Sequence, residues 1–148
     1  MYTWIDNIVL GLFDSYNTYD VYELYDNLNI KIRNLSPDNI LLRGNDSLYF
    51  RDYLNTEIVF IRNDLILESR KFILLHELAH ALLHTHIFET RCSRNCINKG
   101  KLERQANYFA FKMLNINFDE FDLVGMSLEQ IATYIGVPYA PLAQIINL

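Results

Sequence analysis

Two histidines and a glutamate stand together in the segment 72–84, which reads FILLHELAHALLH. His76 and His80 are four residues apart, and four residues turn a helix by about 400°, so the two rings lie one above the other. Two imidazoles on one rigid element are what a tetrahedral zinc ion needs. Glu77 is rotated from this face by one residue, where its carboxylate can take a proton from a zinc-bound water. The pattern predicts a hydrolytic zinc site with His76 and His80 as ligands and Glu77 as general base.

A catalytic zinc site has three protein ligands and one open position, so a third ligand is required. Glu103 is the best candidate, because it shares a helix face with Ala106 and Ala110 at spacings i, i+3 and i+7. The small alanines let this helix approach another one closely and bring the carboxylate to the metal. The alternatives are that Glu103 is a surface residue in a basic segment, and that the two histidines are buried without a metal.

Other residues compete for a place in a metal site. His86 follows the second histidine of the pair by six residues, as in the metzincin zinc motif, but that motif needs a glycine where this chain has Leu83. Without that break His86 points to a different face. His84 lies one turn along the helix and is expected to pack beside the ligands or support them. Cys92 and Cys96, together with the two later histidines, offer a second zinc site of looser spacing.

The elements that must hold these residues follow from apolar spacing and from residues typical of helix ends. We expect helices over residues 3–13, 20–28 and 101–114, and a long helix from Asn63 or Asp64 to about His84. We expect strands over residues 31–35, 47–53 and 57–61. The sequence therefore predicts an α+β fold in which a small sheet supports helices.

The last part of the chain, about residues 127–148, is predicted to be a helical pair. Ser127-Leu-Glu-Gln130 matches a capping box, which marks the start of a helix. Gly136 ends that helix, and a short final helix follows Pro138. The pair also resembles a helix-turn-helix, so a DNA-binding module is one alternative function. Its second helix has no Lys or Arg, which counts against that alternative.

Composition and charge bound the class of protein. The chain has 148 residues, 51% of them hydrophobic, with 5 Gly and 3 Pro, so it can fill the core of one domain over residues 1–148. No apolar run is long enough to cross a membrane, and the first residues lack the pattern of a signal peptide. Two cysteines do not make a disulfide framework, so we expect a cytoplasmic protein with reduced thiols.

The net charge of −5 is unevenly distributed. Basic residues gather over residues 91–104, and none follows Lys112. The chain has no basic tail or stripe, so direct binding of nucleic acid is not expected as its main task.

These residues resemble the motifs of a known family. His76-Glu77-x-x-His80, followed by Glu103-x-x-Ala106-Asn107-x-Phe109-Ala110, is similar to the ImmA/IrrE family of metallopeptidases. The resemblance covers roughly residues 20–148, including the C-terminal helical pair. Gln105 stands where an acid is common in the family, and the loop with Cys92 and Cys96 matches no family motif, which leaves the choice of substrate open.

The resemblance implies a zincin-like domain of the gluzincin type, with one zinc ion per chain. It implies His76, His80 and Glu103 as zinc ligands and Glu77 as general base. Family members are often encoded by prophages, other mobile elements or stress-response loci, and they cleave a helix-turn-helix repressor. We therefore expect a zinc-dependent endopeptidase whose protein substrate is such a repressor, encoded nearby.

The expected reaction also needs a place for the peptide and a donor to the oxyanion. An extended peptide is expected to join an edge strand, for which residues 57–61 are the example. The oxyanion donor is left open among Tyr49, Tyr53, His84 and Tyr108. The alternative function is an anti-repressor that binds the repressor without cutting it and uses zinc only structurally. Glu77 favours catalysis, because a structural site has no use for a base.

Overall fold

The protein has an α+β fold, as the sequence predicts. This computed structural model describes residues 2–87, 89–92, 100–116 and 123–146. In chain order the elements are α1 (Thr3–Tyr16), α2 (Val21–Asn27), β1 (Ile30–Leu35), β2 (Ser47–Arg51), β3 (Glu57–Arg62), α3 (Leu67–Leu83), β4 (Glu89–Cys92), α4 (Lys101–Leu114), α5 (Leu128–Ile135) and α6 (Tyr139–Ile146). No helix in the described part of the chain is long and apolar enough to cross a membrane.

The four strands form one sheet in the order β1-β3-β2-β4. β1 is parallel to β3, whereas β2 is antiparallel to both of its neighbours. β3 therefore lies inside the sheet, and the expectation that residues 57–61 form an edge strand is wrong. Its apolar run buries Val59 and Ile61 completely, which is typical of a central strand. The edge beside β2 belongs to β4, a strand that the sequence analysis did not predict.

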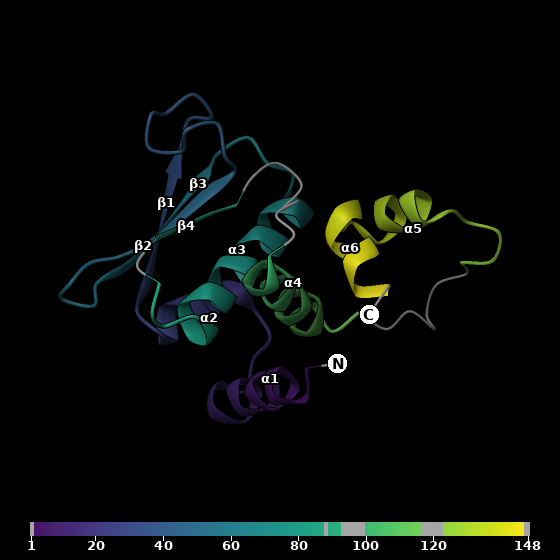
Figure 1. Cartoon of the computed structure of the whole chain (residues 1–148), viewed down its shortest axis with the longest axis horizontal. Coiled ribbons are helices and arrows are strands. Elements are labelled where there is room, and N and C mark those ends of the chain that lie inside the picture. Colours follow the sequence, from purple (N-terminus) through teal and green to yellow (C-terminus); the bar gives the residue numbers. More distant parts are fainter. Residues whose placement is uncertain (1, 88, 93–99, 117–122, 147–148) are drawn as a thin grey trace.

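α3 is the central helix and lies between the sheet and α4 (Figure 1). Its residues 72–81 are all buried, because neighbours cover the helix on both sides. The helix begins at Leu67, later than the predicted start at Asn63 or Asp64. The N-cap position is Ile66, and the two carboxylate oxygens of Asp64 each accept a hydrogen bond of 2.6 Å from Arg62.

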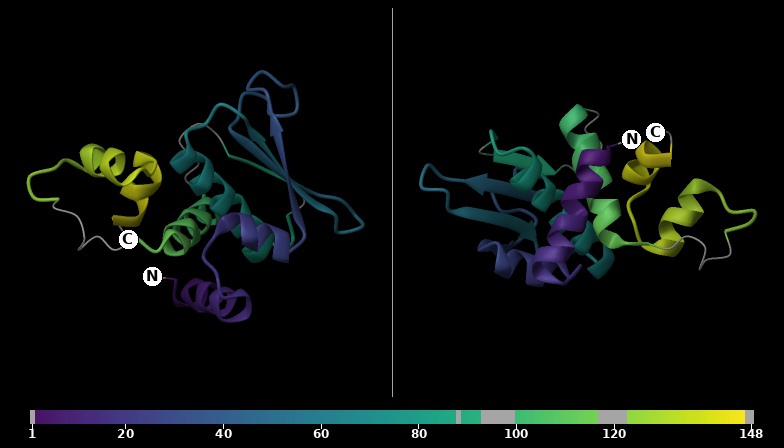
Figure 2. Two further views of the ribbon diagram at one scale, coloured as in Figure 1. Left: turned by 180° about the vertical axis from the view of Figure 1, so that it is seen from behind. Right: turned by 90° about the horizontal axis from the view of Figure 1, so that it is seen from below.

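The C-terminal helical pair lies at the end of the molecule away from the sheet, as all views in Figures 1 and 2 show. The capping box at Ser127 is formed in both directions with Gln130, so α5 begins where the sequence predicts. Gly136 ends α5 in the left-handed region, with φ of 75°. α6 packs against both α5 and α4, which connects the pair to the central helices.

Candidate metal centre

Three side chains from two helices converge between α3 and α4. One ligand atom from each of His76, His80 and Glu103 lies within 4.8 Å of the others. The Nε2 atoms of the two histidines are 3.2 Å apart, and they lie 3.1 and 3.2 Å from the two oxygens of Glu103. These are the three residues that the sequence predicts as ligands.

The spacing of these atoms can be compared with what a metal ion requires. A tetrahedral ion with ligand bonds of about 2.0–2.1 Å, as zinc has, separates neighbouring ligand atoms by about 3.3 Å. The observed separations of 3.1–3.2 Å are close to this value. The donor set of two imidazoles and one carboxylate is also that of a catalytic zinc site. The residues present therefore fit a tetrahedral metal ion.

Helix geometry explains how the three side chains meet. His76 and His80 are one turn apart on the buried face of α3. Glu103 is in the first turn of α4, and its side chain remains 12% exposed, so the cluster is reachable from solvent. Ala106 and Ala110 are fully buried on α4, which packs against α3. Their small side chains allow the close approach that the sequence predicts.

A second layer of side chains holds the two histidine rings. His76 Nδ1 lies 2.8 Å from Asn107 Oδ1, and Asn107 Nδ2 donates a hydrogen bond of 2.6 Å to Gln144 Oε1 on α6. A metal ion at this site would take the Nε2 lone pair, so His76 would carry its proton on Nδ1 and donate it to the Asn107 oxygen. The amide of Gln144 accepts from the other end of Asn107 and keeps its oxygen turned toward the ring.

His80 is supported in a similar way. Its Nδ1 lies 2.9 Å from Nδ1 of His84, whose Nε2 lies 3.0 Å from Gln105 Oε1. With the His80 proton on Nδ1, His84 accepts at Nδ1 and donates from Nε2 to the Gln105 carbonyl oxygen. His84 is 2% exposed and stands behind the metal-facing side. This agrees with its expected place beside the ligands, and it gives Gln105 a function as an acceptor.

Glu77 is fully buried beside the cluster. Its Oε1 accepts a hydrogen bond of 2.5 Å from Ser47 Oγ on β2, and its Oε2 accepts one of 2.9 Å from Thr90 Oγ1 on β4. Together the two bonds fix the orientation of the carboxylate. Ser47 and Thr90 could not be predicted from the sequence, because no local pattern shows which strands pack against α3.

Electrostatics within the cluster favour a positive charge between its members. Burial by itself raises the pKa of Glu103, but hydrogen bonds from His76 and His80 outweigh it and hold that pKa well below its usual range. Burial likewise lowers the pKa of His76, yet the hydrogen bond to Glu103 and the charges of Glu77 and Glu103 raise it on balance. A metal ion supplies such a charge at the same place.

The competing residues lie elsewhere. His86 is exposed beyond the end of α3. Tyr53 is 88% exposed, and the Tyr108 hydroxyl donates a hydrogen bond to Asp6 on α1. Tyr49 is fully buried, and burial together with the charge of Glu57 raises its pKa to about 12. His84 lies beside the cluster, but both of its ring nitrogens are engaged, with His80 and Gln105, so it offers no free donor to an oxyanion. The second zinc site with Cys92 and Cys96 falls outside the described side chains.

Comparisons with known proteins support the same chemistry. The profile of a peptidase family, described as an IrrE N-terminal-like domain, matches residues 26–147. The chain is 32% identical over 143 residues to the protein named Metallopeptidase ImmA of Bacillus subtilis (strain 168), which covers 90% of this chain and 79% of that protein. It is also 32% identical over 152 residues to Uncharacterized immunity region protein 2 of Bacillus phage phi105. That alignment covers 99% of this chain and 91% of the phage protein.

Proposed function

This chain belongs to the ImmA/IrrE family of metallopeptidases, and we propose that it is a zinc-dependent endopeptidase that cleaves a helix-turn-helix repressor. Cleavage would relieve repression of a prophage, another mobile element or a stress regulon. The observation that carries the proposal is the cluster of His76, His80 and Glu103 with the buried carboxylate of Glu77 beside it. The proposed metal is zinc, because two imidazoles and one carboxylate suit it.

The proposed reaction assigns a task to each of these residues. When bound, zinc would polarise the scissile carbonyl and acidify the attacking water. His76, His80 and Glu103 would hold the ion and leave one position open. Glu77 takes a proton from the attacking water and delivers it to the leaving amine. Ser47 and Thr90 hold the Glu77 carboxylate in place during these transfers.

The peptide is expected to lie extended along the open side of β4. β4 is an edge strand, and its Thr90 already touches Glu77. An extended peptide can therefore pair with β4 and pass close to the base. This replaces the earlier expectation of pairing with residues 57–61.

One observation and one general argument support a repressor as the substrate. The name of the phage relative refers to an immunity region, which fits a role in the control of repression. A general protease would also be harmful in the cytoplasm, where a repressor is found, so a narrow target is expected. The basic segment 91–104 is expected to meet an acidic or polar surface of that target.

The test is incubation of the zinc-loaded protein with the repressor encoded beside its gene and, separately, with unfolded casein. Fragments are identified by mass spectrometry, and the Glu77→Gln variant serves as the inactive control. We expect cleavage of the repressor at one or a few bonds and little digestion of casein. Efficient digestion of casein with an intact repressor would contradict the proposal. Binding of the repressor with no cleavage of either protein would favour the anti-repressor.

A further inference from the structure

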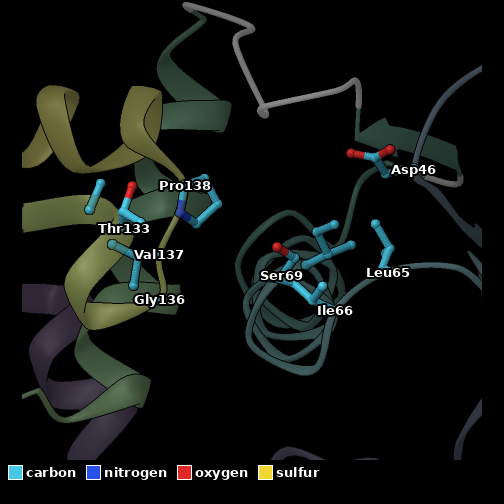
Figure 3. A pocket seen from close by; sticks show the side chains of 10 residues that line it. Asp46, Leu65, Ile66, Ser69, Thr133, Gly136, Val137 and Pro138 are labelled. Atoms are coloured by element: carbon cyan, nitrogen blue, oxygen red, sulfur yellow. The ribbon is translucent and has the colours of Figure 1, made fainter. Parts of the chain in front are cut away.

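A cavity of about 380 Å³ lies between the N-terminal half of α3 and the C-terminal helical pair (Figure 3). Most of its wall is apolar, with Leu65 and Ile73 contributed from one side and Val137 and Pro138 from the other. We call it the helix-pair pocket. A volume of this size lies at the lower end of the range for ligand sites, about 300–1,000 Å³.

The floor of the helix-pair pocket continues the metal-binding face of α3. Ser69 and Ile73 line the pocket, and they precede His76 and His80 at spacings i, i+4, i+7 and i+11. Residues at these spacings share one face of a helix. Ile73 is thus about 4.5 Å before His76 along the helix axis, and Ser69 about 10.5 Å.

The side of the pocket toward the sheet is also connected to the metal site. Asp46 lines the pocket from the side of the sheet, and Ser47, the next residue, donates its hydroxyl to Glu77. Two separate segments of the chain therefore run from the pocket to the residues proposed for the chemistry.

We propose that the helix-pair pocket is a substrate subsite that receives one large apolar side chain from the peptide being cut. The inference rests on the proposed endopeptidase function. An extended peptide advances about 3.3 Å per residue. The axial distances of about 4.5–10.5 Å from His76 therefore put the received residue within three positions of the cleaved bond.

The charge inside the pocket decides against a basic side chain. Asp46 is the acidic residue in the lining, and its side chain is only 9% exposed because it pairs with Arg62 at 3.1 Å. The other polar side chains in the lining are those of Ser69 and Thr133, which are uncharged. A Leu, Ile, Met or Phe side chain that enters the pocket leaves water and packs against the apolar wall. We therefore expect peptides with one of these residues to be preferred by about 10- to 100-fold over peptides with Gly at that position.

The matched pair of test variants comes from α3 itself. Ser69→Phe puts an aromatic ring into the pocket, and Lys71→Phe puts the same ring about 200° round the helix, on an exposed position. Val137→Ala, on the other wall, enlarges the pocket instead. Metal content and melting temperature confirm that each variant is folded, and Val137→Ala decides if Ser69→Phe does not fold.

The experiment uses the zinc-loaded full chain and synthetic decapeptide libraries in which one position at a time is randomised. We expect the unchanged protein and Lys71→Phe to favour Leu, Ile, Met or Phe at one fixed position within three residues of the cut. Ser69→Phe should lose this preference by about 10-fold or more while still cutting peptides with small residues there. Val137→Ala should shift the preference toward Phe and Trp.

The contrary outcomes separate the two proposals. No preference in the unchanged protein, an unchanged preference in Ser69→Phe, or no cleavage of any library peptide overturns the subsite. Cleavage of the repressor without such a preference overturns the subsite alone. An apolar preference in the libraries together with an intact repressor supports the subsite and overturns the repressor as substrate.

Discussion

At the scale of single residues, the carboxylate of Glu77 is held from two strands. Ser47 and Thr90 each donate a hydroxyl to one of its oxygens, and the side chain is fully buried. Each such bond restricts the rotation of the carboxylate. Glu77 is therefore oriented by the sheet, while the proposed ligands are oriented by helices.

Glu77→Gln tests the assignment of the base. The amide has nearly the same shape, so we expect the fold and one zinc per chain to be retained. It cannot accept the proton of water, so we expect peptide cleavage to fall by about 10²-fold or more. Metal analysis and cleavage assays check both parts. Turnover near that of the unchanged protein would remove Glu77 as base, and loss of zinc would identify it as a ligand.

A comparison of Glu103→Ala with His86→Ala tests the ligand set. We expect Glu103→Ala to lose zinc, because it removes a carboxylate that lies 3.1–3.2 Å from both ligand nitrogens. His86→Ala should keep one zinc per chain, because His86 is exposed outside the cluster. Metal content after dialysis measures both. The reverse result would replace Glu103 by His86 in the site.

At the scale of elements, α6 is connected to the metal centre through two side-chain amides. Gln144 accepts from Asn107, and the oxygen of Asn107 faces His76. An amide can turn over and present its nitrogen instead, which would oppose the tautomer that metal binding needs. The connection therefore makes the C-terminal pair part of the support of the site.

Gln144→Leu should weaken zinc binding through this connection. Loss of a supporting partner typically lowers metal affinity by about 10- to 100-fold, and we expect the lower end because Gln144 acts through Asn107. Gln144→Glu retains an acceptor oxygen and should bind zinc about as tightly as the unchanged protein. Competition with a chelator measures these affinities without cleavage. Equal affinities for all three proteins would show that Gln144 only packs.

Gly136 lies between the two helices of the pair, and both its backbone conformation and its surroundings disfavour a side chain. Its φ of 75° disfavours other residues, and an added Cβ would lie 2.8 Å from Glu68 Cγ on α3. We expect Gly136→Ala to destabilise the protein by about 1 kcal/mol or more and to lower its melting temperature by about 2–4 °C per kcal/mol. In the double variant with Glu68→Ala, part of the loss should return. A melting temperature unchanged by Gly136→Ala would contradict the crowding.

At the scale of the whole molecule, features local in sequence were predicted well. The bounds of α4 and the capping box of α5 follow from short-range patterns, and so does the pairing of His76 with His80. The order of the sheet did not, because it depends on contacts far apart in the chain. For the same reason β4 and the hydroxyls of Ser47 and Thr90 were missed. Asn107 was within reach of prediction, since it lies one turn after Glu103.

The charge of the molecule predicts that it does not bind DNA directly. The net charge is −5, and Glu129 is the only charged residue from 127 to 148. α6 also packs on α4 and α5, which occupies part of its surface. We expect no shift of duplex DNA in a gel at micromolar protein and low salt. A salt-dependent shift would contradict this prediction and favour the alternative that the C-terminal pair is a DNA-binding helix-turn-helix.

The hold of two strands on Glu77 has a consequence for the newly made chain. The bond from Ser47 closes a loop of 30 residues, whereas the two histidines are neighbours on one helix. Contacts distant in sequence form late, because closing a long loop loses more entropy. In a chain where α3 and α4 have packed together but the sheet has not yet docked, the carboxylate of Glu77 is not held in place. We therefore expect a chain with an undocked sheet to cleave little, so that unfinished copies spare the proteins around them.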